Sequence, residues 1–477
     1  MLAICLETSC FSTLEFFMAT TEIPNIMNTS QSQVYRKSMD IQTDAHLSKL
    51  TGLSLRKNFS WNLIGNIVYS GCQWAMLVVL AKLTNTEVVG RFALGLAITA
   101  PIILFSQLQL RGIQATDAKG EYNFGHYLGL RLLTTVIALF LIIGVALANG
   151  YPFETALVII AVGFSKAFES VSDVYYGLMQ RYERMDRIAR SYLIKGPLSL
   201  AVLSIMVYLT SDVFWGVVGF STVWGVLLLT YDLKNAGATL NELKATITNN
   251  KNTSKQMWPV FNRRKLLRLV WLALPLGIVM TLLSLNTNIP RYFIESHFGE
   301  SKLGIFAALV YLIVAGKTIV MAMGQAVVPR LSIYYAKGEI NPFKKLMFHL
   351  LGIGFFLGMG GVLMALIIGR PILILLYRPE YAEHTIVFVW LMVVGGLSYV
   401  ASILGYAMTA ARYFKAQLPL FIIVTLTTYL ASLWLIPKYA LLGAAFSLLA
   451  GTLVQILGSG IIIVIVLKNL KKQLFHA

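Results

Sequence analysis

The chain has 477 residues, of which 57% are hydrophobic and 13% are charged. An ordinary soluble domain contains about 45–50% apolar and about 25% charged residues, so this composition argues against a soluble globule. The cysteines are Cys5, Cys10 and Cys72, an odd number without the spacing of metal ligands. Neither a disulfide framework nor a zinc site is therefore expected to hold the fold together.

The first 55 residues differ in character from the rest. Residues 1–20 contain Glu7 and Glu15 but no Lys or Arg, so they lack the basic start of a secretory signal. Residues 21–50 are rich in Ser, Thr, Asn and Gln and show no helical period. We interpret residues 1–55 as a flexible tail, or as a translated stretch upstream of the true start.

Apolar runs of about 20 residues, each long enough to cross a bilayer core, recur from Trp61 onward. Such runs must be helical, because barrel strands are about 10 residues long and alternate in polarity. We therefore predict an all-α polytopic membrane protein with about 12 transmembrane helices. The predicted spans are residues 60–82, 90–110, 127–148, 155–178, 192–210, 213–232, 267–293, 303–328, 346–368, 385–409, 417–436 and 440–467.

The basic residues predict the orientation of the chain. Lys and Arg collect in cytoplasmic connections, and most of those between the predicted spans fall on one side if both termini are cytoplasmic. The net charge of +18 is then largely a property of that face. Anionic membrane lipids are the predicted partner, whereas nucleic acid would require a soluble basic domain.

The longest connection carries the basic cluster Arg263-Arg264-Lys265 and divides the spans six and six. The predicted segments are a flexible or spurious tail at 1–55, an N-lobe at 56–232, a cytoplasmic basic linker at 233–265, a C-lobe at 266–467 and a basic cytoplasmic tail at 468–477.

A short motif supports a repeat between the two lobes. The pattern Gly-x-Phe-Ala occurs at Gly90, Phe92 and Ala93 and again at Gly304, Phe306 and Ala307. Each copy follows one span and opens the next. Together with the six-plus-six division, it indicates two like-oriented repeats, an arrangement typical of secondary transporters.

Lys166 lies near the middle of the predicted span 155–178. A charge at this depth costs about 2.5–3.5 kcal/mol on insertion scales. Glu169 and Asp173 follow at three and seven residues, on the same stripe of the helix. One interpretation is a neutralised charge pair that locks helix packing. The other is a cavity wall, in which Lys166 meets an anionic substrate and a carboxylate carries a coupling ion.

Lys317 lies in the predicted span 303–328, two turns before Gln325, and that span has no acidic residue. An ammonium group at this depth must find a partner on another helix or bind an anion. Lys317 is therefore the stronger candidate for a contact with an anionic substrate.

The predicted span 267–293 ends in a polar group. Asn288, Arg291 and Glu295 lie within about 60° of one another on a helix, and Pro290 predicts a break or kink there. The group is a candidate ligand site. Alternatively, Arg291 and Glu295 form an i, i+4 pair at the outer mouth.

Neutral polar residues also follow one stripe at the start of the predicted span 60–82. Asn62, Asn66 and Gln73 belong to it, and it suits either sugar hydroxyls or helix contacts. The six histidines are scattered without an HExxH motif, and no Gly-x-Ser-x-Gly elbow occurs. We therefore predict neither an enzyme nor a bound cofactor or metal.

Several segments resemble the polysaccharide, or O-antigen, flippases of the multidrug/oligosaccharidyl-lipid/polysaccharide exporter superfamily. They are NLIGNIVYSGCQWAMLVVLAKLTNTEVVGRFALGLAITAPI at 62–102, LALPLGIVMTLLSLNTNIPRYFIESHFGESKLGIFAALVYL at 272–312, GQAVVPRLSIYYAKGE at 324–339, LLYRPEYAEHTIVFVWLM at 375–392 and GYAMTAARYFKAQLPL at 405–420. The similarity covers about residues 55–470.

The resemblance implies a bacterial inner-membrane protein that moves an undecaprenyl-diphosphate-linked oligosaccharide, such as an O-antigen or exopolysaccharide unit, by alternating access between two lobes. The implied diphosphate contacts are Lys166, Lys317 and Arg291, and the implied polar lining is Asn62, Asn66, Gln73, Asn288 and Gln325. Glu169 and Asp173 are the candidates for coupling to H⁺ or Na⁺. Glycan-assembly proteins are further candidate partners.

Two other functions stay open. A cation-coupled multidrug exporter is the alternative within transport, although a cationic cavity argues against it. A membrane glycan polymerase or acyltransferase is a third hypothesis, but it needs a catalytic site outside the membrane or a catalytic histidine or aspartate pair.

Overall fold

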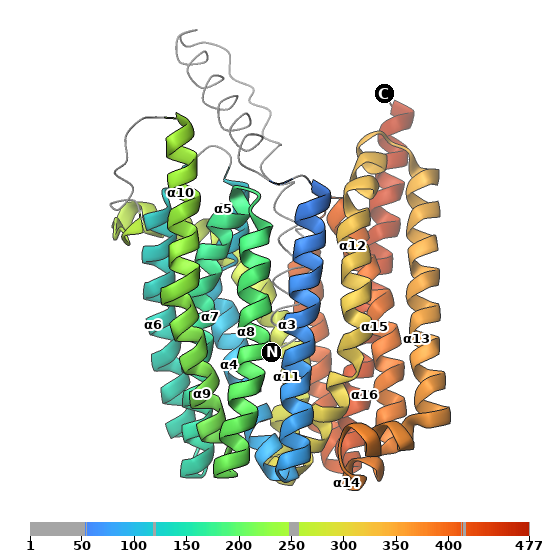
Figure 1. Ribbon diagram of the computed structural model, residues 1–477. Helices are drawn as coiled ribbons and strands as arrows, with labels where there is room; N and C mark the ends of the chain where they lie inside the picture. The colour runs from blue at the N-terminus through green and yellow to red at the C-terminus, as the bar shows by residue number, and fades with distance from the viewer. Residues whose placement is uncertain are drawn as a thin grey trace.

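The computed structural model describes residues 55–117, 121–247, 257–411 and 416–476, together with residues 53 and 413. All regular structure within these residues is helical, which confirms the predicted all-α class. The helices stand side by side as a bundle (Figure 1). The predicted tail at 1–55 falls almost wholly outside the described residues.

One group of helices comes from the first half of the chain. These are α3 (Leu55–Leu83), α4 (Thr86–Gln107), α5 (Leu110–Thr116), α6 (Phe124–Ala148), α7 (Phe153–Arg181), α8 (Met185–Thr210), α9 (Val213–Leu227), the π-helical turn η2 (Leu228–Asp232) and α10 (Leu233–Ile247). The second half forms α11 (Arg263–Tyr311), α12 (Ile313–Ala336), α13 (Ile340–Leu376), α14 (Pro379–Ala382), α15 (Thr385–Ala410) and α16 (Gln417–His476).

The described residues contain ten helices that are long and apolar enough to cross a membrane. Two of them are too long for one crossing, because α11 has 49 residues and α16 has 60, whereas about 20 residues span a bilayer core. The backbone leaves the helical region inside each, at Gly299 (φ 77°) and Ala440 (φ 49°). In α11, Gly299 ends one span, and the 12 residues that follow it run on into α12 to form the next. In α16, Ala440 separates two spans. Divided in this way, the described helices agree with the predicted twelve spans.

The break in α11 lies nine residues beyond the proline. A break or kink was predicted at Pro290; the chain is not broken there, because the backbone dihedral angles stay helical and turn non-helical only at Gly299. Membrane helices accept proline because neighbouring groups satisfy the freed backbone carbonyl. The left-handed conformation at Gly299, by contrast, suits a residue without a Cβ atom.

The predicted linker at 233–265 begins as helix, because α9, η2 and α10 run on continuously to Ile247. Residues 248–256 lie outside the described part of the chain. At the other end of the sequence, the predicted tail at 468–477 continues helix α16 as far as His476.

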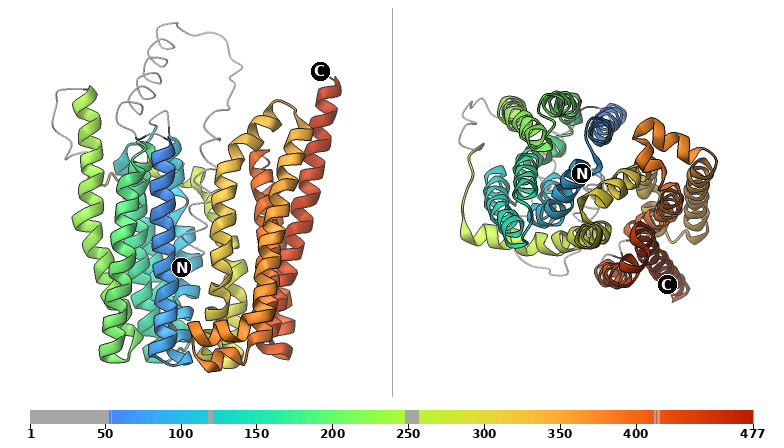
Figure 2. Two further views of the ribbon diagram at one scale, coloured as in Figure 1. Left: turned by 45° about the vertical axis from the view of Figure 1, so that its right-hand side comes forward. Right: turned by 90° about the horizontal axis from the view of Figure 1, so that it is seen from below.

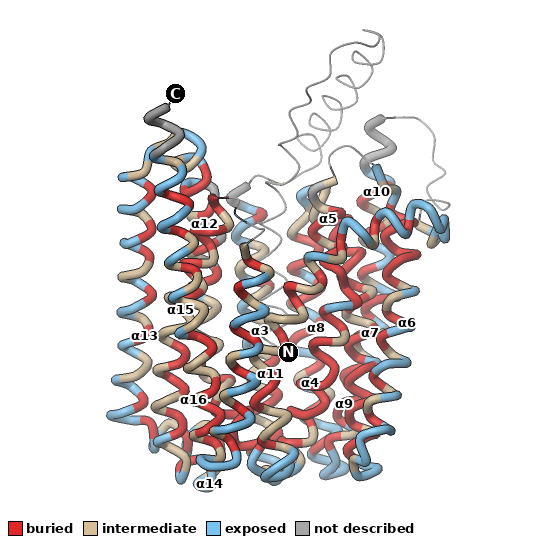
Figure 3. Tube along the Cα trace, turned by 180° about the vertical axis from the view of Figure 1, so that it is seen from behind, coloured by how far each residue is buried: buried red, intermediate tan, exposed pale blue. Residues whose placement is uncertain are grey.

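The two groups of helices form two lobes, with α11 passing between them (Figure 1). The lobes converge at the end that carries α14 and diverge toward the end that carries the C-terminus (Figure 2). Buried residues fill the interior of each lobe, and exposed residues lie mainly on the outer faces (Figure 3). This distribution fits helices whose outer faces contact lipid.

The repeated Gly-x-Phe-Ala motif lies where the lobes converge. A Cβ atom added to Gly90 would fall 1.8 Å from the carbonyl oxygen of Glu300, and one added to Gly304 would fall 2.0 Å from that of Thr86. Each glycine thus meets the carbonyl four residues before the other glycine. The two copies contact each other in a two-fold manner, as the predicted internal repeat requires.

Polar contacts join the lobes at the same end. Arg91 on α4 donates to Glu300 on α11 at 2.9 Å and also pairs with Glu87 and Glu154. The hydroxyl oxygens of Thr86 and Ser301 lie 2.6 Å apart. Glycine contacts, charges and hydroxyls therefore hold this end of the interface closed.

Candidate functional site

Lys166 is fully buried within the N-lobe. Its Nζ donates to Glu169 Oε2 at 2.5 Å and lies 5.5 Å from the centre of the Trp224 ring. The hydroxyl of Tyr69 on α3 also donates to Glu169, at 3.0 Å. Lys166 is therefore neutralised by its own helix, and it lines neither of the two cavities described below.

Asp173 is held between two arginines. Arg131 Nη2 on α6 donates to Asp173 Oδ2 at 3.2 Å, and Arg111 Nη1 on α5 donates to Oδ1 at 3.3 Å. Arg131 is fully buried. Both carboxylates expected to take part in ion coupling thus already have fixed cationic partners.

A third buried pair was not among the sequence candidates. Lys195 on α8 lies 3.5 Å from Asp232 in η2, and both side chains are buried. Asp232 also accepts hydrogen bonds from Ser191 at 2.6 Å and Tyr176 at 3.2 Å. Both charges fall within predicted spans, 192–210 and 213–232, so a search for intramembrane charges of opposite sign would have found them.

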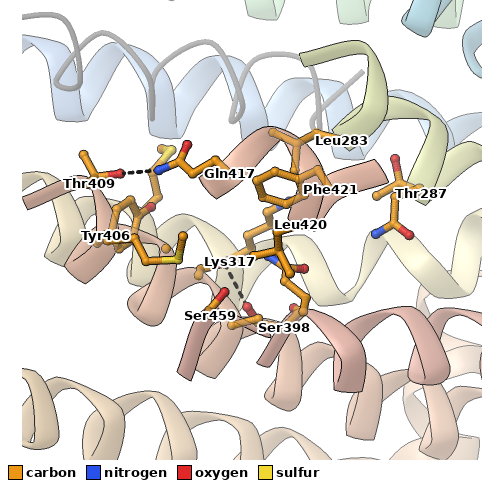
Figure 4. Close-up of a pocket in the computed structure, with 17 residues that line it drawn as sticks. Leu283, Thr287, Lys317, Ser398, Tyr406, Thr409, Gln417, Leu420, Phe421 and Ser459 are labelled. Atoms are coloured by element: carbon orange, nitrogen blue, oxygen red, sulfur yellow. Dashed lines mark hydrogen bonds between the residues drawn. The ribbon is translucent and has the colours of Figure 1, made fainter. Parts of the chain in front are cut away.

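The C-lobe contains a cavity of about 180 Å³ between α11, α12, α15 and α16, which we call the C-lobe cavity (Figure 4). Its polar lining residues are Asn286, Thr287, Lys317, Ser398, Ser402, Tyr406, Thr409, Gln417, Gln455 and Ser459. Among the described residues, no Asp or Glu lines it. Lys317 is half-buried and is the only charged group of this lining.

A second cavity, of about 770 Å³, lies between the lobes, and we call it the interlobe cavity. Its walls are mostly apolar and come from both lobes. The N-lobe wall is formed by α3 residues Leu63, Ile67, Ser70, Gly71 and Trp74. The C-lobe wall consists of Tyr311, Leu312, Val314, Thr318, Ile319, Met323, Met364, Ile372, Leu376 and Phe388. Thr318 is next to Lys317 in α12. One helix therefore has a cationic polar cavity on one side and an apolar cavity on the other.

Arg291 makes a different contact from the one expected at the outer mouth. Its Nη1 donates to Asn288 Oδ1 at 3.0 Å, and Asn288 Nδ2 donates to the Ser284 carbonyl at 2.9 Å. The alternative pair with Glu295 is not among the ion pairs of the described residues. The Nε atom of Arg291 is buried without a hydrogen-bond partner there.

Four of the predicted neutral lining residues, Asn62, Asn66, Gln73 and Asn288, are not among the residues that line either cavity. Asn66 donates to the carbonyl and side-chain oxygens of Asn62, each at 2.8 Å. Gln73 is buried, and its Nε2 has no hydrogen-bond partner in the described part of the chain. The side chain of Gln325 lies outside what the structure describes. The described residues also contain no group of three or more His, Cys, Asp or Glu that could hold a metal ion.

The two-lobed helical fold is similar to that of solved transporters described as members of the MOP superfamily. The structure resembles an inward-facing multidrug resistance MATE family transporter of that superfamily, with a TM-score of 0.60 and 14% identity, covering 91% of this chain and 99% of that one. It also resembles a MOP superfamily transporter from Pyrococcus furiosus, described as having a binding pocket of reverse polarity, with a TM-score of 0.57, 14% identity and coverage of 93% and 99%.

Sequence comparison places the chain more narrowly. Residues 55–334 match the family model described as polysaccharide biosynthesis protein. The chain is 30% identical over 395 residues to the capsular polysaccharide biosynthesis protein CapF of Staphylococcus aureus, which covers 82% of this chain and 95% of that protein. The chain therefore belongs to the polysaccharide biosynthesis protein family, as the resemblance in its sequence predicts.

Proposed function

We propose that the protein is a flippase that moves an undecaprenyl-diphosphate-linked oligosaccharide across a bacterial inner membrane by alternating access. The family and the transporter fold support this class of activity. The cargo would be a repeat unit of an O-antigen, capsule or exopolysaccharide. Both termini would lie in the cytoplasm, and the lobes would diverge toward that side.

The single observation that carries the proposal is Lys317 in the C-lobe cavity. A cation at bilayer depth is costly, and no described carboxylate in the cavity wall neutralises it. A diphosphate would supply the missing negative charge. The surrounding hydroxyl and amide groups can donate further hydrogen bonds to phosphate oxygens, which are strong acceptors.

The interlobe cavity suits the other part of such a substrate. Its walls are mostly leucine, isoleucine, valine, methionine and aromatic side chains, which bury a polyprenyl chain without leaving polar groups unsatisfied. The charged headgroup of such a lipid would therefore occupy the C-lobe cavity on one side of α12, and its apolar chain would occupy the interlobe cavity on the other side.

The remaining predicted contacts have unequal support. Arg291 lacks a carboxylate partner among the described residues, so we retain it as a second diphosphate contact. Lys166 is neutralised by Glu169 in this conformation, and we assign it to helix packing. Coupling to H⁺ or Na⁺ through Glu169 or Asp173 would require these carboxylates to leave their present partners.

The experiment is complementation of a deletion strain. Loss of the gene should leave lipid-linked glycan on the inner leaflet, and the wild-type gene should clear it. Lys317→Met at normal abundance should fail, whereas Lys344→Met, which removes an exposed lysine outside the cavities, should restore export. Full restoration by Lys317→Met would contradict the proposed contact.

A cation-coupled multidrug exporter is the competing function, because MATE transporters share the fold. The positive charge in the C-lobe cavity opposes the binding of an organic cation there. Transport of such a cation by purified protein in vesicles, without transport of lipid-linked glycan, would favour that alternative.

A further inference from the structure

The chain crosses the surface of the N-lobe before it enters α11. The backbone N–H of Val260 donates to the Gly125 carbonyl in the first turn of α6 at 2.8 Å. A Cβ atom on Gly125 would lie 2.6 Å from the carbonyl oxygen of Trp258, and one on Gly129 would lie 2.7 Å from that of Val260. The two glycines of α6 thus allow this segment to pack tightly against the start of the helix.

The first turns of α11 continue along the same end of the bundle. Gly277 packs against Leu108, just past the end of α4, where an added Cβ atom would lie 2.8 Å from the leucine side chain. The start of α6 and the end of α4 lie at the same end of the molecule. From the start of α11 at Arg263 to Gly277 there are about 14 residues, which as a helix cover about 21 Å. Seen from below, this part of α11 runs sideways across the N-lobe (Figure 2).

One face of this stretch packs on the protein and the other does not. Leu266, Leu269 and Ala273 are buried at helical spacing. The large apolar side chains on the open side are Trp258, Phe261, Leu267, Trp271 and Leu272, of which Trp258 is 71% and Trp271 73% exposed. Aromatic side chains in this position are typical of a membrane–water interface.

Four basic residues share the open side. Arg263, Arg264, Lys265 and Arg268 are exposed, and residues 257–275 contain no Asp or Glu. None of the ion pairs in the described part of the chain involves these four residues, whereas Arg184 and Arg187 are both paired with Glu242. The segment is therefore a concentrated positive charge beside exposed aromatic and aliphatic groups.

We propose that residues 257–272 form a docking surface for the anionic lipids of the leaflet at the C-terminal end of the bundle. The tryptophans and leucines insert at the level of the headgroups, and the four basic side chains bind lipid phosphates. A surface with both kinds of side chain gains membrane affinity from the apolar area that it buries and from its attraction to anionic lipids. Each basic residue near such a surface strengthens binding about fivefold. The surface is separate from both cavities, so the proposal does not depend on the transported substrate.

The test uses the full chain in nanodiscs of phosphatidylcholine with increasing phosphatidylglycerol. Native mass spectrometry counts the phosphatidylglycerol molecules that stay bound. The variant Arg263→Gln/Arg264→Gln/Lys265→Gln/Arg268→Gln should bind phosphatidylglycerol at least tenfold more weakly than the wild type. The matched control removes four exposed basic residues from the same end of the C-lobe, Arg330→Gln/Lys337→Gln/Lys344→Gln/Lys345→Gln. It should lose several-fold less affinity than the first variant, because residues 330–345 contain no tryptophan to insert beside the charges.

Two measurements keep the proposal testable if the quadruple variant folds poorly. Phosphatidylglycerol binding by the wild type should fall as NaCl rises, because salt screens charged contacts. Trp258→Ala/Trp271→Ala should weaken retention of both lipids, whereas removal of charge should affect phosphatidylglycerol alone. Equal loss in the two quadruple variants, or binding that is insensitive to salt, would overturn the proposal.

Discussion

The two lobes differ in how the cations inside them are partnered. In the N-lobe, Lys166, Lys195 and Arg131 are buried and each faces a carboxylate. In the C-lobe, Lys317 lies in a cavity whose described walls carry hydroxyl and amide groups but no carboxylate. The two halves thus share a helical architecture but differ in how the charges inside them are partnered.

The difference separates charges that are paired inside the fold from a charge that lines a cavity. A buried cation whose partner is fixed contributes to a packed interior, and removal of one partner leaves the other uncompensated. A cation that faces a polar cavity keeps its capacity to bind an anion. Under the proposed function, the paired charges of the N-lobe stabilise the fold, and Lys317 of the C-lobe contacts the anionic headgroup.

The largest expected effect is on the stability of the N-lobe. Lys195→Met leaves Asp232 buried without its cation and should lower the free energy of unfolding by about 3–5 kcal/mol. Lys195→Met/Asp232→Leu replaces the whole pair and should recover most of the loss, as measured by unfolding in detergent. A single variant as stable as the wild type would show that the pair does not hold the lobe together.

The next effect concerns the junction of the lobes. Gly90→Ala places a methyl group against the backbone of Glu300, and overpacking of this kind costs about 1–3 kcal/mol. The cost falls on the state in which this end is closed, so cross-linking of Thr86→Cys to Ser301→Cys in a background without other cysteines should decrease. Gly71→Ala is the control, since nothing lies within 4 Å of its added Cβ atom, and it should leave the cross-linking yield unchanged.

Lys317→Met should affect transport rather than stability, unlike the substitution of Lys195 in the N-lobe. Its stability should stay within about 1 kcal/mol of the wild type, because no carboxylate in the described cavity wall loses a partner. Transport of lipid-linked glycan should nevertheless fall at least tenfold, as measured in reconstituted vesicles. Lys317→Arg preserves the charge and should retain part of the activity. A strongly destabilised Lys317→Met protein with normal specific transport would place this lysine with the structural charges.

The smallest effect is expected at the exposed partner of Arg91. The side chain of Glu154 is 71% exposed and that of Glu300 is 12% exposed. Glu154→Gln should change stability by less than about 1 kcal/mol, as exposed ion pairs do. Glu300→Gln should have the larger effect, since it also weakens a contact between the lobes. Equal effects in thermal unfolding would show that burial does not distinguish the two contacts.

The sequence predicts the spans well because length and hydropathy are local properties. It also predicts the Lys166–Glu169 pair, which depends only on the three-residue spacing within one helix. Asp173 with Arg131, and Lys195 with Asp232, join different helices. Their partners depend on how the helices rotate and pack, which hydropathy does not determine.

The lining of the C-lobe cavity could not be predicted from the sequence either. Ser398 and Ser402 resemble ordinary helical serines, and Ser402 does donate to the Ser398 carbonyl at 2.8 Å. Only the assembly of α11, α12, α15 and α16 brings such residues together around Lys317. By contrast, the expected neutral lining at Asn62 and Asn66 forms its own contacts on α3, because polar residues on one stripe can satisfy one another.

The most direct test of the central claim is the binding of undecaprenyl diphosphate to purified protein, compared with the binding of undecaprenol, which has the same chain without the charge. Wild-type protein should bind the diphosphate more tightly, and Lys317→Met should weaken that binding at least tenfold while leaving undecaprenol unaffected. Equal affinity of the wild type and Lys317→Met for the diphosphate would contradict the claim that the C-lobe cavity recognises an anionic headgroup.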